Sequence, residues 1–291
     1  MTDTFETPSG KSAADENFPV GSFLIRPDLR RHVHIFYRFA RAADDIADNP
    51  ELAAEDKLTR LACMGEIVQG AAGDSPSAVA MRGSLAETGL GPQHCLDLLA
   101  AFTQDARKAR YRDWSELLGY CLLSAAPVGR QFLDLHGEGA ACRPAADALC
   151  NALQIVNHLQ DCGADYRALD RVYLPTDDLA ATGARIEDLG GERLTPALRA
   201  TLDRVIAPLE GLLAECADIV RQVDDTRIAL ECQIIRDLCV RLTGRLKRQD
   251  PLAVRVAISK PAAAGFALGS VVGGLWRRRA RPASPRLAAS S

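Results

Sequence analysis

The stretch that decides the fold is NALQIVNHLQDCGADYRALDRVYLP, residues 151–175. Its apolar residues recur at helical spacing, and Asn157, Asp161 and Asp165 follow one another at intervals of four along one stripe of the predicted helix. Like charges at this interval destabilise a helix by about 0.2 to 0.5 kcal/mol. Carboxylates on a largely apolar helix also need a compensating charge. The pattern therefore indicates that these acids meet a bound cation.

A second acidic stripe lies in YRFARAADDIAD, residues 37–48. Steps of four and three residues predict one polar face of a helix that carries Arg30, His34, Tyr37, Arg41, Asp44 and Asp48. One such stripe alone is commonly a solvated surface. Two stripes favour Mg²⁺, because this ion takes carboxylate oxygens and completes its shell with water and substrate phosphates.

Several neighbouring side chains have two interpretations at this stage. Arg41 either pairs with an acid of its own helix or clamps an oxyanion with its two-pronged guanidinium. Arg171 and Tyr173, which follow the second stripe, either anchor a loop or reach the same site. Gln154 begins the second stripe, one turn before Asn157.

The rest of the chain predicts an all-α fold in a single domain. Apolar residues recur at helical spacing in nearly every long segment, and no alternating run bounded by hairpin turns is found. Breakers such as GAAGDSPS, residues 70–77, separate helices and are too short to be domain linkers. We expect the compact body to end near residue 250 and a basic segment to occupy residues 251–291.

Composition limits the partners. The hydrophobic fraction of 47% and the charged fraction of 25% are ordinary for a globular protein. From residue 241 onward there are eleven basic residues and one acidic residue, net +10, whereas the first 240 residues carry 24 basic and 37 acidic residues, net −13. An acidic body does not suit nucleic acid, and the basic end favours an anionic surface. Nine cysteines without a CxxC pair or a secretory signal indicate reduced thiols in the cytoplasm.

Together these motifs resemble the squalene and phytoene synthase family. YRFARAADDIAD resembles its first Asp-rich motif, LQIVNHLQDCGADYRALDRVYLP its second, and RYRDWSELLGYCLLSAAPVGR, residues 110–130, the helix between them that lines the pocket. The resemblance implies an isoprenoid synthase helical bundle with a central cavity and two or three Mg²⁺ ions. The implied metal ligands are Asp44, Asp48, Asn157, Asp161 and Asp165, whose four carboxylates would be catalytic. The implied substrate-binding residues are Tyr37, Arg41, Gln154, Asn157, Arg171 and Tyr173.

Within the family, ENFPVGSFLI, residues 16–25, and SAAPVGR, residues 124–130, most resemble hydroxysqualene synthases of bacterial hopanoid pathways. Gln160 replaces the arginine common before the second motif in phytoene and squalene synthases. The implied reaction ionises presqualene diphosphate, rearranges the carbocation in an apolar cavity and captures it with water, and NADPH is not expected. Candidate wall residues are Leu118, Leu122, Leu123 and Val128. Head-to-head condensation of two prenyl diphosphates and a non-catalytic interaction protein of the same fold remain alternatives.

The basic end has its own two interpretations. Residues 261–276 are sixteen small or apolar residues, fewer than the roughly 20 that span a bilayer. Trp276 followed by Arg277, Arg278 and Arg279 is typical of an interfacial helix on an anionic leaflet. The alternative is a last core helix with a basic end. We therefore expect a cytoplasmic protein with peripheral contact to the inner face of the membrane, close to neighbouring enzymes of squalene synthesis.

Overall fold

The structure is a computed structural model that describes residues 5–7 and 24–279. Its described part is all-α, as predicted, and its only extended pairing is an isolated bridge between Arg110 and Val172. Most of ENFPVGSFLI, residues 16–23, and the tail from residue 280 lie outside the described residues. The elements are α1 (Arg30–Asp48), α2 (Ala54–Val68), α3 (Pro76–Thr88), α4 (Gln93–Asp105), α5 (Trp114–Ser124), α6 (Ala126–Leu135), η1 (Ala140–Cys142), α7 (Arg143–Leu169), α8 (Thr176–Thr182), η2 (Ile186–Gly190), α9 (Pro196–Glu215), α10 (Ile219–Gln222), α11 (Thr226–Leu246) and α12 (Lys260–Arg279).

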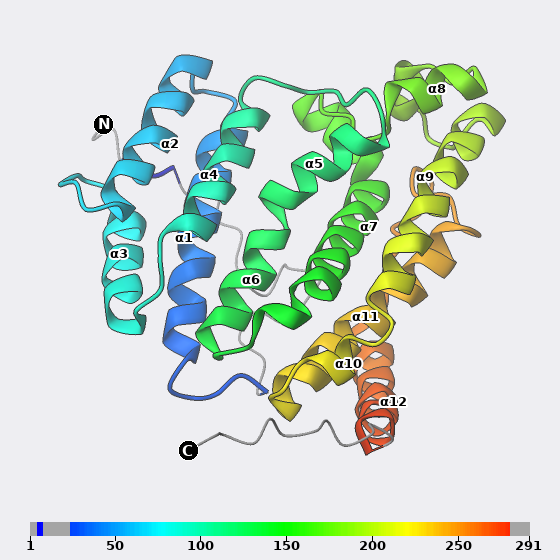
Figure 1. The fold of residues 1–291 in the computed structure, drawn as a ribbon. Helices are drawn as coiled ribbons and strands as arrows, with labels where there is room; N and C mark the ends of the chain where they lie inside the picture. Colours follow the sequence, from blue (N-terminus) through cyan, green and yellow to red (C-terminus); the bar gives the residue numbers. More distant parts are fainter. Residues whose placement is uncertain (1–4, 8–23, 280–291) are drawn as a thin grey trace.

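The helices bury two main hydrophobic clusters. One cluster joins α1, α2, α3 and α4, and Phe39, Met64 and Met81 are fully buried in it. The other joins the helices from α5 to α11 around α7, with Ile155 and Leu209 at its centre. Figure 1 shows α1 on one side of the molecule and α7 with α11 on the other, with α5 and α6 between them.

The two helices predicted from the acidic stripes are α1 and α7. Helix α7 begins with a proline at its first turn, where a missing N–H costs no hydrogen bond. It ends at Asp170, which has a left-handed φ of 49°. Helices α6 and α7 approach closely at Gly129, where an added Cβ would lie 2.5 Å from the sulfur of Cys150. Glycine thus permits the contact that brings these helices together.

The segment after residue 250 packs on the body. The carbonyl of Val256 accepts a hydrogen bond from Gln160 of α7, and Val256 is itself buried. Helix α12 lies against α11, where Ala267 and Val271 contact the cluster formed by Leu230 and Ile234. This packing does not test the domain boundary that we predicted near residue 250, so the boundary stays a prediction.

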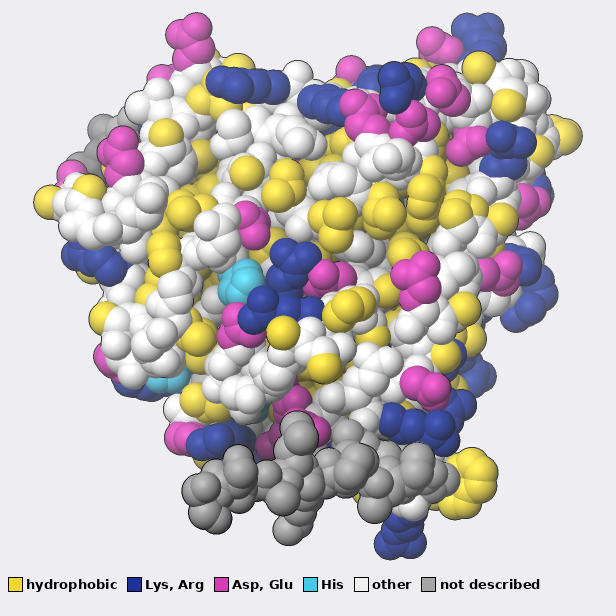
Figure 2. Space-filling view, in the orientation of Figure 1, with side chains coloured by type: hydrophobic (Ala, Val, Ile, Leu, Met, Phe, Trp, Pro, Cys, Tyr) yellow, Lys and Arg dark blue, Asp and Glu magenta, His cyan; other side chains and the backbone are white. Residues whose placement is uncertain are grey.

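One face of α12 remains exposed and apolar. Leu268, Val272 and Trp276 have 68%, 62% and 72% of their surface accessible, and they follow one another at helical spacing. Figure 2 shows hydrophobic and basic side chains together at the corner where α12 ends. Arg278 donates hydrogen bonds of 2.6 Å to the carbonyls of Val220 and Val223, so this arginine fastens α12 to α10.

All nine cysteines are free thiols, and the seven buried ones pack as small core residues. Burial raises the pKa of several thiols, including that of Cys121 to about 12, so these groups stay protonated at neutral pH. Among the described helices, none has the length and apolarity needed to cross a bilayer.

Candidate active site

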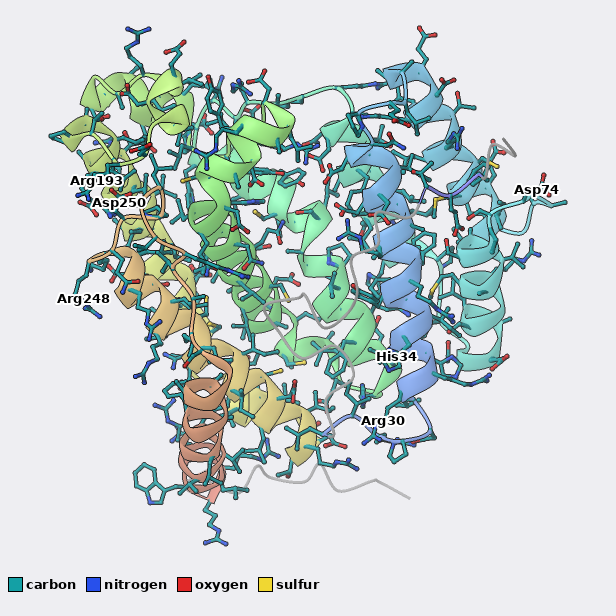
Figure 3. The ribbon with its side chains drawn as sticks, turned by 180° about the vertical axis from the view of Figure 1, so that it is seen from behind. Arg30, His34, Asp74, Arg193, Arg248 and Asp250 are labelled. Carbon is teal, nitrogen blue, oxygen red and sulfur yellow. The ribbon has the colours of Figure 1, made fainter. Side chains whose placement is uncertain are left out.

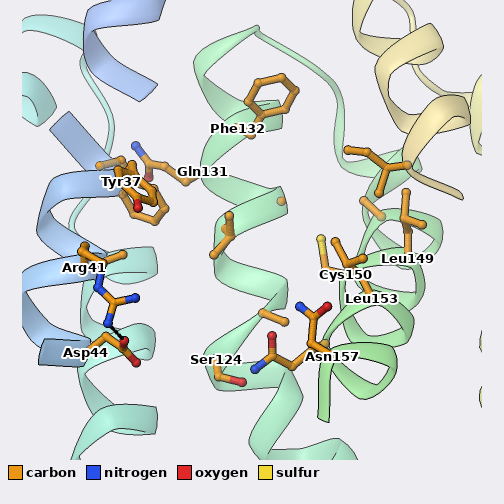
Figure 4. Close-up of a pocket in the computed structure, with 18 of the residues that line it drawn as sticks. Tyr37, Arg41, Asp44, Ser124, Gln131, Phe132, Leu149, Cys150, Leu153 and Asn157 are labelled. Atoms are coloured by element: carbon orange, nitrogen blue, oxygen red, sulfur yellow. Dashed lines mark hydrogen bonds and ion pairs between the residues drawn. The ribbon is translucent and has the colours of Figure 1, made fainter. Parts of the chain in front are cut away.

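A cavity of about 440 Å³ lies between the two hydrophobic clusters. Helices α1 and α4 supply one wall, and α5, α6, α7 and α11 supply the others. Figure 4 shows α1 facing α7 across this space, with α5 and α6 between them. The volume of the cavity is typical of sites that bind small molecules. The two acidic stripes therefore face one common cavity.

On α1, the predicted polar face enters the cavity from Tyr37 onward. Tyr37, Arg41, Asp44 and Asp48 all line the cavity. The two remaining members, Arg30 and His34, are not among the lining residues, and Figure 3 shows them at the N-terminal end of the helix.

On α7, Gln154, Asn157 and Asp165 line the cavity. Figure 4 shows the amide of Asn157 directed into the space between the helices. Asp161 lies on the same stripe but is exposed and is not among the lining residues. The predicted set is thus brought together except for Asp161, whose role as a metal ligand stays a prediction.

Arg41 binds acids of its own helix. Its Nε donates to Asp45 Oδ1 over 2.9 Å and its Nη2 contacts both Asp44 and Asp45. Of the two interpretations that the sequence left open, the structure therefore shows pairing of Arg41 with acids of its own helix. Because Asp44 is the cavity-lining member of the pair, the guanidinium nevertheless lies at the cavity wall.

Arg171 connects three chain segments inside the cavity. Its Nη1 lies 3.0 Å from Asp48 Oδ1, and its Nε lies 3.8 Å from Asp105 Oδ1. The side chain of Asp105 has 2% of its surface exposed, and its Oδ2 accepts a 2.8 Å hydrogen bond from the hydroxyl of Tyr120. Asp105 was not predicted from the sequence, although it lines the same cavity as both stripes.

The carboxylates are held in conditions that disfavour their charge. Burial raises the pKa of Asp44 to about 7, and the neighbouring Asp48 acts in the same direction while Arg41 opposes it. Burial likewise raises the pKa of Asp105 to about 6, with Arg171 and the Tyr120 hydroxyl opposing. Burial thus favours the protonated form of both acids unless a positive charge is bound beside them.

Three aromatic side chains line the cavity together with Arg171. Tyr173 stacks on His158 with ring centroids 3.4 Å apart, and the ring of Tyr120 lies 5.7 Å from that of Tyr173. Burial, and then the charge of Arg171, lowers the pKa of His158 to about 3. His158 is therefore neutral over the physiological pH range, and like Tyr120 it was missed by the sequence analysis.

The remaining lining is largely apolar and comes from both clusters. Val128 lines the cavity as expected, whereas the prediction for Leu118, Leu122 and Leu123 was wrong. Helix α5 presents Tyr120 and Ser124 to the cavity, so the three leucines point elsewhere. The apolar lining residues are Ile25, Val33, Phe36, Ala40, Phe102, Ala125, Val128, Phe132, Leu133, Leu135, Ala146, Leu149, Leu153, Leu169, Ile219 and Ile235.

The donor set fits Mg²⁺ bound together with a diphosphate. Among the described residues, no three His, Cys, Asp or Glu side chains converge as in a closed protein-only metal site. The acids instead line the cavity from α1, α4 and α7, which suits an ion that keeps water and substrate phosphates in its shell. Asp48 Oδ1 and Asp105 Oδ1 are buried and accept no hydrogen bond from the described residues, and both face the guanidinium of Arg171. A metal ion that bound either oxygen would share it with Arg171.

Comparison with known proteins decides the family. The family model described as squalene/phytoene synthase matches residues 11–262. The chain belongs to the squalene/phytoene synthase family. The prediction made from the two Asp-rich motifs is thereby confirmed.

Individual family members agree in sequence and fold. A hydroxysqualene synthase from Rhodopseudomonas palustris is 46% identical over 256 residues, which are 88% of each chain. A hydroxysqualene synthase from Zymomonas mobilis is 42% identical and covers 92% of this chain and 91% of its own. The crystal structure of a squalene synthase from Alicyclobacillus acidocaldarius matches with a TM-score of 0.71 at 30% identity, over 81% of this chain and 90% of the other. The isoprenoid synthase fold expected for the family is therefore present.

Proposed function

We propose that this chain converts presqualene diphosphate into hydroxysqualene, with Mg²⁺ as its metal. One observation carries the proposal: a single cavity is lined both by a group of carboxylates and arginines from α1, α4 and the segment after α7 and by a larger number of apolar side chains. A prenyl diphosphate likewise has a charged diphosphate group and a long apolar hydrocarbon tail. Relatives named hydroxysqualene synthase, 42% to 46% identical, support the choice of reaction within the family.

In this proposal Asp44, Asp48, Asn157 and Asp165, with Asp161, hold the metal. Bound Mg²⁺ supplies Lewis-acid stabilisation of the departing diphosphate. Arg41 and Arg171 bind diphosphate oxygens, for which a bidentate guanidinium is well suited. Tyr37, Gln154 and Tyr173 shape the substrate site between these charges and the apolar wall, which shields the carbocation from uncontrolled contact with water.

Product analysis of the purified protein tests this function. The protein is incubated with presqualene diphosphate and separately with farnesyl diphosphate, with Mg²⁺ or EDTA, and with or without NADPH. We expect an alcohol from presqualene diphosphate that requires Mg²⁺ and does not require NADPH. Squalene formed only with NADPH, or condensation of farnesyl diphosphate, would instead establish one of the head-to-head synthases. Absence of any product with either substrate would favour a non-catalytic interaction protein.

We also propose that α12 rests on an anionic membrane leaflet. Its exposed apolar stripe of Leu268, Val272 and Trp276 ends beside three arginines. The hydrogen bonds of Arg278 to carbonyl oxygens leave its positive charge intact, and Arg279 is exposed. An apolar stripe joined to positive charge complements the lipid interface, where a C30 substrate and product are also concentrated.

A further inference from the structure

Gln131 is a buried amide in the apolar part of the cavity. It lies in α6, lines the cavity and has 1% of its surface exposed. Its Oε1 is buried and has no hydrogen-bond partner among the described residues. An amide oxygen buried without a partner destabilises the folded state, because it has lost its hydrogen bonds to water. A ligand with a hydrogen to donate would remove this cost.

The position of Gln131 separates it from the charged groups. Figure 4 shows it beside Tyr37, which precedes Arg41 by one turn and Asp44 by two. Two turns of helix correspond to about 10 Å along the axis. Gln131 therefore lies about two turns of α1 from the acid Asp44 and about one turn from Arg41.

Its lining neighbours along α6 are apolar. Val128 precedes it by one turn on α6, and Phe132 and Leu133 follow it directly. The hydrocarbon part of an isoprenoid would occupy this region, and hydrocarbon has no hydrogen to donate to an amide oxygen. Water has two hydrogens to donate, and a buried water needs at least two polar groups around it. The amide of Gln131 and the side chain of Tyr37, which Figure 4 shows beside it, are two such groups.

Other buried polar atoms without a partner do not fill the same position. Ser124 Oγ lines the cavity, but Figure 4 shows it beside Asn157, at the level of Asp44. Gln233 has an unpartnered Oε1 as well, but it is not among the lining residues and its Nε2 donates to Asp237 over 2.8 Å. His158 Nε2 also lines the cavity without a partner, but its ring stacks on Tyr173, which follows Arg171. Of these four residues, Gln131 is the one whose buried acceptor lies among the apolar lining residues of α6.

We infer that the amide of Gln131 holds the water molecule whose oxygen becomes the hydroxyl of the product. This inference rests on the proposed function. Gln131 Oε1 accepts one hydrogen of the water and leaves an oxygen lone pair directed at the carbocation. A neutral amide suits this position because a carboxylate would itself be attracted to the cation and compete as nucleophile.

The reaction balances without an oxidant or a reductant. The carbon–oxygen bond to diphosphate breaks and its electron pair leaves with the diphosphate. The water oxygen then forms a new carbon–oxygen bond with the carbocation and loses one proton, which the released diphosphate takes up. The products are the alcohol and hydrogen diphosphate. Without an ordered water, loss of a proton from the carbon skeleton would give a hydrocarbon polyene.

Gln131→Met tests the inference, because methionine has a similar volume and cannot accept the hydrogen bond. Purified wild-type and variant proteins are incubated with presqualene diphosphate and Mg²⁺, and diphosphate release, alcohol and hydrocarbon are each quantified. We expect the ratio of alcohol to hydrocarbon to fall about tenfold while diphosphate release stays within about threefold, since one hydrogen bond to the nucleophile is lost. Gln233→Met is the matched control, and we expect its product ratio to equal that of the wild type.

The product ratio is set within each turnover, so it does not depend on how much of the variant folds. An unchanged ratio in Gln131→Met overturns the inference. Loss of diphosphate release in Gln131→Met, with melting temperature retained, also overturns it, because the residue would then act in ionisation. A wild-type protein that forms no alcohol refutes the proposed function itself, which distinguishes the two failures.

Discussion

The guanidinium of Arg171 lies 3.0 Å from the carboxylate of Asp48, which joins the segment after α7 to the last residue of α1. The same guanidinium lies 3.8 Å from Asp105 at the end of α4. One buried cation thus holds together three elements that surround the cavity. Its charge opposes the rise in the pKa of Asp105 that burial causes.

Replacement of Arg171 by Met should lower kcat/KM for presqualene diphosphate about 100-fold or more, because a charge-assisted contact to the leaving group is lost. Steady-state kinetics measures this effect. Arg204→Met is a suitable control, since Arg204 pairs with Asp178 at the surface and does not line the cavity. Equal losses in both variants would argue against a role of Arg171 at the diphosphate.

Removing the charge of an acid in either stripe should weaken metal binding, whereas removing the charge of a surface acid should not. Asp44→Asn and Asp165→Asn should each lower kcat about 100-fold or more and reduce the rise in melting temperature that Mg²⁺ with inorganic diphosphate produces. Asp203→Asn, on an acid that is 56% exposed, should change neither quantity. Retention of the full thermal shift in Asp44→Asn would contradict its assignment as a ligand.

Asp161 provides a sharper test because it is exposed and outside the cavity lining. If it is a ligand, as the sequence predicts, Asp161→Asn should lower kcat and the Mg²⁺-dependent thermal shift as Asp165→Asn does. The pair of variants is measured side by side in the same assay. An activity within about twofold of the wild type would remove Asp161 from the metal site, since loss of a stabilising charge commonly costs far more.

The metal-free protein should lose stability as the pH rises from about 4 to about 6. The pKa of Asp105 is raised from 3.8 to about 6 in the folded state, so its stabilising contribution is full below pH 4 and is lost as the pH rises through about 6. Asp105→Asn cannot ionise. Between pH 5 and pH 7.5, its melting temperature relative to the wild type should therefore rise by about 4 °C. Thermal melts in EDTA measure this, and a constant difference would contradict the raised pKa.

Contact of α12 with lipid should depend on its exposed stripe. Val272→Asn combined with Trp276→Ser should lower partitioning into anionic phospholipid vesicles about tenfold or more, because two apolar side chains no longer enter the interface. Flotation assays with anionic and with zwitterionic vesicles measure it. Val79→Asn alters an exposed valine on α3 and should leave partitioning unchanged. A wild-type protein that floats with neither vesicle would exclude the proposed membrane contact.

The predictable and unpredictable parts of the site differ in physical origin. Tyr37, Arg41, Asp44 and Asp48 were predicted together because helical periodicity alone places them on one face. Asn157 and Asp165 were predicted for the same reason.

Asp105 carries no such pattern. It ends α4 in the polar stretch TQDARKAR, residues 103–110, and its importance arises from contacts with Tyr120 and Arg171 that only the tertiary fold creates. The three leucines of α5 illustrate the same limit: an apolar helix predicts burial, but its neighbours decide which face meets a cavity.

The pairing of Arg41 with Asp44 and Asp45, and of Arg171 with Asp48, has a consequence for selectivity. Each arginine already has a counter-charge from the chain, so a lone inorganic anion that approaches must compete with carboxylates for it. Under the proposed function, a diphosphate that arrived with divalent cations would meet less competition, because the carboxylates would hold the cations and leave the guanidinium groups to the diphosphate. These ion pairs would then make the empty site selective against abundant cellular anions.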